Sequence, residues 1–253
     1  MISLVELMIN NTGLVDWEFL LLCAISCLGS LITASIGIGG GTLMLATMAL
    51  LMPPAVLIPI HGVVQLGSNF GRALLFRREI IREIIPMFLI GTIIGVILGG
   101  QVVVALPVAV LQFILSIFIL YTVWVPTLKA LSVKKFTFFG IGAFGAFATM
   151  FVGATGPLMT PFVAAITRDR KQVVGTQACL LTIQHTFKLI AFGLIGFSFV
   201  PYSPLIISLI IFAFIGTYIG KLVLNRIPEN IFRVTLKLVL TIMALKLCFT
   251  AVS

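Results

Sequence analysis

Acidic side chains are scarce in this sequence, and none lies inside a hydrophobic segment. The 253 residues include seven carboxylates: Glu6, Asp16, Glu18, Glu79, Glu83, Asp169 and Glu229. Carboxylates inside membrane spans commonly form proton relays and ion pathways. A carboxylate site for Na⁺ or protons at mid-membrane is therefore not expected, and a membrane-embedded pair of catalytic aspartates is excluded.

Sequence motifs of enzymes and metal sites are also missing. No H-E-x-x-H, Walker loop or G-x-S-x-G occurs, so zinc protease, nucleotide hydrolase and α/β-hydrolase chemistries have no support. The four cysteines lie in apolar segments without C-x-x-C or Cys/His spacing, which predicts packing thiols: Cys23, Cys27, Cys179 and Cys248. We expect no enzyme activity, no catalytic residue, no metal and no cofactor.

Hydrophobic residues dominate the composition. They make up 60% of the chain, charged residues make up 9%, and the mean hydropathy is +1.27. Long apolar runs with internal glycine favour helices surrounded by lipid over the short alternating strands of a β-barrel. The composition predicts an all-α polytopic membrane protein, a single membrane domain over 1–253 in contact with a lipid bilayer. The net charge of +9 comes from basic residues in short loops, which is typical of the positive-inside rule, and we expect no nucleic-acid partner.

The chain divides into two similar halves around a hydrophilic linker at 126–136. A shift of 116 residues aligns Gly37-Ile-Gly-Gly-Gly41 with Gly153-Ala-Thr-Gly-Pro157. The same shift pairs His61 with Gln177, Ser68 with Gln184, Asn69 with His185, Arg72 with Lys188, and Phe76 with Phe192. We interpret this as an internal duplication, with repeat one at about 18–126 and repeat two at about 136–250.

The charges of the loops decide between two topologies. Apolar segments run at about 18–35, 42–52, 55–76, 84–104, 107–126, 136–152, 157–167, 172–199, 202–223 and 229–250. If 18–52 and 136–167 each crossed once, giving eight simple transmembrane helices, the basic loops would be split between both sides of the membrane. If each glycine motif is instead the tip of a helical hairpin, all basic loops lie on one side. We prefer the second topology, two inverted repeats that each contain a glycine-broken hairpin and three transmembrane helices, as in secondary transporters.

The two glycine breaks are the first candidate binding elements. A non-helical backbone at membrane depth is tolerated only beside protein or a water-filled cavity. A helix that restarts there points free N–H groups and its positive dipole end into that space. The candidate residues are Gly39, Gly40, Gly41 and Thr42 in the first half and Thr155, Gly156 and Pro157 in the second. The alternative is close helix packing through small residues.

Polar stripes on two helices are the second candidate. Steps of three and four place His61, Gln65, Ser68, Asn69 and Arg72 on one helix face, with Gln177, Gln184, His185 and Lys188 on its counterpart. Cations, amides and hydroxyls without a carboxylate indicate a site for an anion. The alternatives are that the basic side chains snorkel to the membrane surface and that the histidines are structural.

The glycine motifs resemble a known family. G-I-G-G-G-T-L-M-L (37–45) and its echo G-A-T-G-P-L-M-T-P (153–161), followed by R-D-R-K (168–171), are similar to motifs of the sulfite exporter TauE/SafE family, and the likeness covers essentially the whole chain. It implies a multi-pass permease of a bacterial-type plasma (inner) membrane that moves sulfite, organosulfonates or related sulfur-containing and organic anions. Thr155 departs from the motif, which usually has glycine there; its hydroxyl would stiffen the break or contact the substrate.

The sequence thus predicts a secondary transporter of small anions that works by alternating access. An anion channel would use the same donors without alternating access, and a membrane assembly subunit without transport activity is a third hypothesis. The expected partners are a small anionic substrate and lipid, while formation of a homo-oligomer is left open.

Overall fold

The computed structural model describes residues 12–36, 39–124, 133–223 and 229–252, and these are helical almost throughout. The α-helices are α2 (Asp16–Ile36), α3 (Gly40–Leu51), α4 (Pro54–Leu75), α5 (Ile85–Val103), α6 (Val108–Trp124), α7 (Thr137–Val152), α8 (Gly156–Ile166), α9 (Arg170–Leu194), α10 (Ser203–Val223) and α11 (Glu229–Val252). Three 3-10 turns, η1 (Arg77–Glu79), η2 (Arg82–Ile84) and η3 (Val200–Tyr202), lie in the connections. These bounds follow the predicted apolar segments closely.

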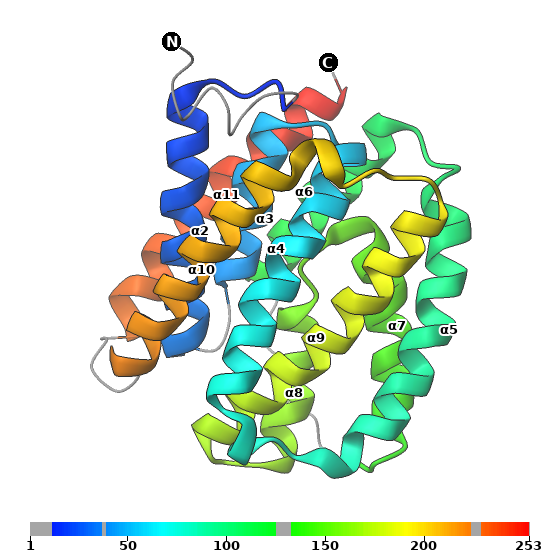
Figure 1. The fold of residues 1–253 in the computed structure, drawn as a ribbon, viewed down its shortest axis with the longest axis vertical. Helices are drawn as coiled ribbons and strands as arrows, with labels where there is room; N and C mark the ends of the chain where they lie inside the picture. Colours follow the sequence, from blue (N-terminus) through cyan, green and yellow to red (C-terminus); the bar gives the residue numbers. More distant parts are fainter. Residues whose placement is uncertain (1–11, 37–38, 125–132, 224–228, 253) are drawn as a thin grey trace.

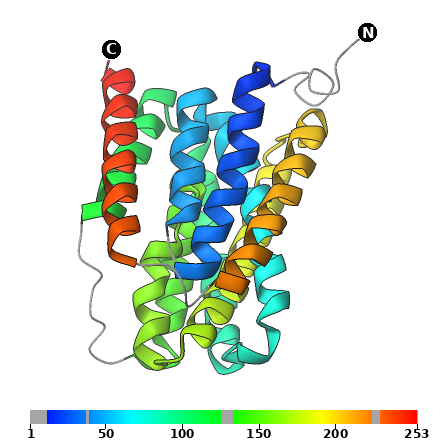
Figure 2. The same ribbon diagram turned by 90° about the vertical axis from the view of Figure 1, so that its left-hand side faces the viewer.

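Two helix pairs fold back on themselves at the glycine motifs. α2 and α3 both reach the end of the molecule where the chain termini lie, whereas α7 and α8 both reach the opposite end (Figure 1, Figure 2). Gly39 precedes α3 with a φ of 102°, and Gly153 follows α7 with a φ of 76°. L-amino acids with a side chain rarely adopt such angles, so glycine is needed at both turns. Gly37 lies outside the described residues.

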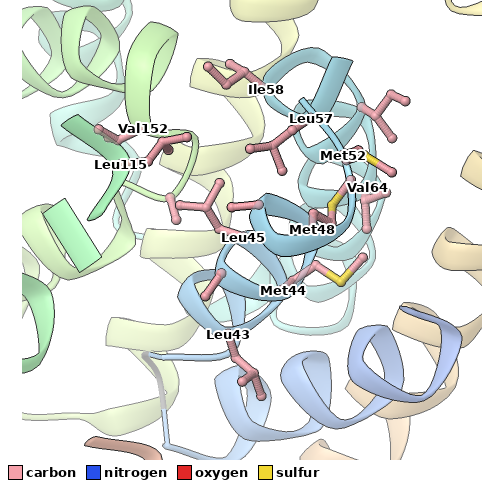
Figure 3. Close-up of a cluster of buried hydrophobic side chains, with 14 of the residues drawn as sticks. Leu43, Met44, Leu45, Met48, Met52, Leu57, Ile58, Val64, Leu115 and Val152 are labelled. Atoms are coloured by element: carbon pink, nitrogen blue, oxygen red, sulfur yellow. The ribbon is translucent and has the colours of Figure 1, made fainter. Parts of the chain in front are cut away.

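The short helix α3 lies at the centre of the apolar core. Its residues from Thr42 to Ala49 are all buried, and Met44, Leu45 and Met48 lie among side chains of α4, α6 and α7 (Figure 3). Twelve residues rise about 18 Å, too short to cross a ~30 Å hydrocarbon core. α3 therefore brings its N-terminus to the interior of the molecule.

Glycine contacts join each half to the hairpin of the other half. α5 packs against α7, and α10 packs against α2. Gly91, Gly95 and Gly99 of α5 approach the main chain of α7, while Gly216 and Gly220 of α10 approach the carbonyl groups of Cys27 and Leu31 in α2. Small residues at four-residue spacing allow this close contact between membrane helices.

Apolar and polar side chains are distributed as expected for a protein in lipid. Within the described residues, the spans Asp16–Ser35, Arg82–Val103 and Val200–Leu222 are long and apolar enough to cross a membrane. Large apolar side chains are exposed on the outer helices, for example Ile97, Phe113, Ile211 and Ile242. The more polar α4 and α9 pack against each other within the bundle (Figure 1). This is the arrangement of an integral membrane protein.

Candidate functional site

A chain of polar side chains runs along α4. The Arg72 guanidinium donates to Asn69 Oδ1 (3.0 Å) and Ser68 Oγ (3.1 Å), and Asn69 Nδ2 donates to the main-chain carbonyl of Gln65 (2.7 Å). Arg72 is only 2% exposed, so it does not snorkel to the surface. The residues that the sequence pattern placed on one face of this helix thus contact one another inside the protein.

His61 connects this stripe to both glycine breaks. Its Nε2 lies 3.1 Å from the carbonyl oxygen of Gly41 and 3.3 Å from Gln65 Nε2. Its Nδ1 has no hydrogen-bond partner and faces Gly153, where an added Cβ would lie 2.9 Å from it. A histidine nitrogen that donates to a carbonyl cannot also accept from an amide, so His61 makes one of its two Nε2 contacts at a time.

The first turn of α3 has main-chain amides without a partner within the helix. The first i→i−4 hydrogen bond of this helix runs from Leu43 to Gly39 (2.9 Å), so the N–H groups of Gly40, Gly41 and Thr42 have no partner within the helix. Gly39 carries no side chain to cap them. The positive end of the α3 dipole therefore remains available to a ligand.

In the second half, side chains of α9 already contact the break. Thr155 Oγ1 donates to Gln184 Oε1 (2.5 Å), and Gln177 Nε2 donates to the Gly156 carbonyl (3.1 Å) and to Thr160 Oγ1 (2.7 Å). The Thr155 hydroxyl makes no capping bond to α8. The residue that departs from the family motif thus binds a residue of the polar stripe.

Lys188 Nζ and His185 Nδ1 are buried on α9 without a hydrogen-bond partner. Lys188 is fully buried, its Nζ has no hydrogen bond, and its Cε lies close to Gly62 of α4. Nζ lies over the Phe192 ring, 5.9 Å from its centroid. Gly62 and Arg72 are ten residues apart on α4, or roughly 15 Å along the helix axis. Lys188 and Arg72 therefore occupy different levels of the molecule and do not converge on a single point.

A cavity lies beside the first break. It is a small space between α2, α3 and α4, and it is lined by Ser26, Gly29, Ser30, Thr33, Gly40, Gly41, Met44, Val64, Gln65 and Ser68. Four of these belong to the predicted site: Gly40, Gly41, Gln65 and Ser68. Gly39, Thr42, His61, Asn69 and Arg72 adjoin this cavity in the sequence or through contacts. Thr155, Gly156 and Pro157 form the second break, which Gln177 and Gln184 contact, and His185 and Lys188 follow on α9.

Buried side-chain atoms without a partner gather in this region. Eight occur in the part of the chain that the structure describes, and six belong to predicted site residues: Thr42 Oγ1, His61 Nδ1, Arg72 Nε, Gln184 Nε2, His185 Nδ1 and Lys188 Nζ. Buried polar groups are normally paired. Three of these atoms, Arg72 Nε, Gln184 Nε2 and Lys188 Nζ, can donate, so they indicate a site for a ligand that accepts hydrogen bonds. No carboxylate is buried among the described residues, which favours an anion.

Sequence analysis missed the polar face of α2. Ser26, Ser30 and Thr33 follow steps of four and three and line the cavity, a spacing that could have revealed them. Serine and threonine often bond their own helix carbonyls, and Thr33 does so with Gly29 (2.9 Å), so the pattern is easily attributed to packing. Arg170 was also missed; it donates to the Ser35 carbonyl in the last turn of α2.

Comparison with protein families assigns the chain. The profile described as sulfite exporter TauE/SafE matches residues 20–247, nearly the whole length. The chain belongs to the sulfite exporter TauE/SafE family. This is a family of membrane transporters, in agreement with the resemblance of the two glycine motifs. No curated protein and no solved structure matches the TauE/SafE chain described here.

Proposed function

We propose that this TauE/SafE protein is a secondary transporter of small anions, with sulfite and related sulfur oxoanions or organosulfonates as the first candidates. The observation that carries the proposal is the group of six unpaired buried polar atoms around the two glycine breaks, with no buried carboxylate among the described residues. An oxoanion has several strong acceptor oxygens and a negative charge. It would therefore satisfy the unpaired donors and compensate the buried positive charge.

The helix ends and the two buried cations contribute in different ways. Amides at the start of α3 and α8 are fixed dipoles that stabilise negative charge at mid-membrane. Lys188 approaches α4 at Gly62, roughly 15 Å along that helix from Arg72, so the two cations attract the anion at two levels of its path. Gln65, Ser68, Asn69, Gln177, Gln184 and the two histidines provide neutral polar groups along α4 and α9.

Alternating access is part of the proposal. The reciprocal packing of α5 with α7 and of α10 with α2 supports two inverted repeats that exchange helices, with boundaries near 18–126 and 136–250. In such proteins, rocking of one bundle against the other exposes a central site to each side in turn. The contact between α4 and α9, together with the approach of His61 to Gly153 at the end of α7, would be the surface that changes. The family and the basic loops support a plasma membrane of bacterial type as its location.

Transport in proteoliposomes tests this function. Purified protein should take up labelled sulfite into vesicles at a rate that saturates, and unlabelled sulfite inside should accelerate the uptake by counter-transport. Unitary currents in planar bilayers would instead establish an anion channel. Absence of flux for sulfite, sulfate, thiosulfate, sulfoacetate and taurine, with folded protein in the vesicles, would contradict the proposal and leave an assembly role.

A further inference from the structure

Three titratable side chains lie at the level where α4 contacts α9. Lys188 and His185 are one turn apart on α9, and His61 is on the facing helix α4. All three are at most 1% exposed. Lys188 interacts electrostatically with both histidines, and the two histidines interact with each other. These three residues, which we call the basic cluster, therefore lie close together inside the bundle.

Each member of the basic cluster has a nitrogen without a hydrogen-bond partner. These atoms are His61 Nδ1, His185 Nδ1 and Lys188 Nζ. When His61 Nε2 donates to the Gly41 carbonyl (3.1 Å), its Nδ1 is left with a lone pair that can accept a proton. Ionisable groups inside membrane proteins commonly form proton relays. The basic cluster therefore has the atoms needed to bind a proton and to pass it on.

No carboxylate lies near the basic cluster on the described elements that pack most closely against α9. These elements are α4, α5, α7, α8 and η1, and α5, α7 and α8 contain no charged or titratable residue. The other such residues are Arg72 on α4, Arg77, Arg78 and Glu79 on η1, and Arg170, Lys171 and Cys179 on α9 itself. Glu79 lies beside Gly175, thirteen residues before Lys188, or roughly 20 Å along α9. A positive charge in the basic cluster thus has no counter-ion on these elements.

Resting on the transport function proposed above, we propose that the basic cluster binds a proton together with each anion, with Lys188 Nζ as the proton-binding atom. A proton and a monoanion that enter together leave the site without net charge. Either one alone leaves an uncompensated charge in a low-dielectric interior, which is strongly unfavourable. Each ligand therefore strengthens the binding of the other, because coupling between two sites is reciprocal.

Coupling of this kind makes the protein a proton–anion symporter. The proton binds to the Nζ lone pair of Lys188 from water on one side of the membrane and is released with the anion to water on the other. In this structure a Cβ added at Gly62 of α4 would lie 3.3 Å from Lys188 Cε, so α4 and α9 must separate to open a path to Nζ. That is the movement that alternating access requires, and it allows proton coupling without a carboxylate inside the bundle.

Proton uptake on anion binding tests the inference. Sodium methanesulfonate and sodium isethionate are suitable probes because their sulfonate groups take up no proton at neutral pH. Calorimetric titration of the purified full-length protein at pH 8, in two buffers of different ionisation enthalpy, gives the number of protons taken up per bound anion. Because binding is linked, we expect about one for the unmodified protein. Lys188→Arg should take up none, since guanidinium stays protonated while still attracting the anion. Lys237→Arg makes the same exchange at an exposed position of α11 and is the matched control.

Proteoliposomes provide the corresponding transport measurement. An inward methanesulfonate gradient should acidify a lumen that holds a pH-sensitive dye, and a proton gradient alone should drive uptake of the labelled anion. Lys188→Arg should exchange labelled for unlabelled methanesulfonate without acidification and without a response to the proton gradient. Should the larger side chain prevent folding, Lys188→Gln is the second variant, and it should bind the anion at least tenfold more weakly without proton uptake.

Several outcomes would overturn the inference. Anion binding by the unmodified protein without proton uptake, or uptake that follows the membrane potential but not the proton gradient, would refute it while leaving transport intact. One proton per anion in Lys188→Arg or Lys188→Gln would place the proton on another group. If neither sulfonate bound, the pH dependence of sulfite uptake provides the test: sulfite changes its own protonation equally with both proteins, so identical profiles for unmodified and Lys188→Arg protein would refute the inference. Absence of flux for every anion would show that the proposed function itself fails.

Discussion

Lys188 and Arg72 are both buried cations, but their surroundings give them opposite effects on stability. Arg72 donates to Ser68 and Asn69, so much of its hydrogen-bonding capacity is satisfied. Lys188 Nζ has no hydrogen-bond partner. An amino group transferred from water into an apolar interior without a partner costs free energy in either protonation state. Lys188 therefore destabilises the empty protein, a cost that is consistent with a role in function.

Replacement of each cation by methionine should separate these effects. Lys188→Met should raise the apparent melting temperature of the purified protein by a few degrees and strongly reduce sulfite uptake. Arg72→Met should lower the melting temperature, because each lost hydrogen bond to a charged donor is worth about 1.5–3 kcal/mol, and should reduce uptake as well. Thermal unfolding and vesicle uptake measured on the same preparations check this. A lower melting temperature in Lys188→Met would indicate a structural partner for this lysine.

The polar stripe shows what residue patterns can and cannot predict. Steps of three and four predicted that His61, Gln65, Ser68 and Arg72 share one face of α4, and the contacts between them agree. The same reasoning could not show that Gln184 lies against Gly145 of α7 and accepts a hydrogen bond from Thr155 at the start of α8. Those contacts depend on packing between helices distant in the sequence, which periodicity does not report.

At the scale of elements, the adjacent glycines at the start of α3 have different tasks. A Cβ at Gly40 would collide with the main chain of Gly29, so Gly40 allows α2 and α3 to touch. A Cβ at Gly41 would point toward the Gln65 amide, 3.2 Å from its Nε2. The sequence assigned both residues to the substrate site, but only the direction of the missing side chain distinguishes packing from contact with the stripe.

Alanine substitutions should resolve the two tasks. Gly40→Ala should lower the melting temperature markedly, because main chain cannot move aside easily. Gly41→Ala should largely preserve stability, since Gln65 is flexible, and should weaken sulfite binding by displacing its amide. Gly140→Ala is the control, because its Cβ would meet no atom within 4 Å. Equal destabilisation by Gly40→Ala and Gly140→Ala would contradict the packing role of Gly40.

Helix extents were predictable from the sequence, but helix partners were not. Most helices end within a few residues of the end of an apolar run, where glycine, proline or charged residues follow. The agreement arises because helices that cross lipid need continuous apolar segments. The reciprocal contacts of α5 with α7 and of α10 with α2 depend on glycine faces that meet across the two halves. The sequence offered only the similarity of Ile90-Gly-Thr-Ile-Ile-Gly95 to Ile215-Gly-Thr-Tyr-Ile-Gly220, which indicates equivalent helices without naming their partners.

At the scale of the whole molecule, charge is segregated between its two ends. The connections α3–α4, α5–α6 and α9–α10 lie at the end that holds the termini (Figure 1), and residues 52–53, 104–107 and 195–202 contain no charged side chain. The opposite end carries the basic residues of η1, η2 and the α8–α9 connection. This segregation arises only because α2–α3 and α7–α8 fold back, since a straight crossing at either break would reverse every later loop.

Cysteine accessibility in intact cells should establish which end faces the cytoplasm. In a variant whose four native cysteines are replaced by alanine, we expect single cysteines at Lys135 and Arg168 to be protected from a membrane-impermeant maleimide. A single cysteine at Ala105 should be labelled. All three positions are exposed, so protection would reflect the membrane and not burial, and labelling of Lys135→Cys and Arg168→Cys after permeabilisation is the control. The positive-inside rule predicts this result because short loops rich in lysine and arginine remain in the cytoplasm.

Labelling of Lys135→Cys but not Arg168→Cys would place the two loops on opposite sides of the membrane. That outcome would require α7 and α8 to cross the membrane as one span, and it would remove the paired hairpins on which the anion site depends.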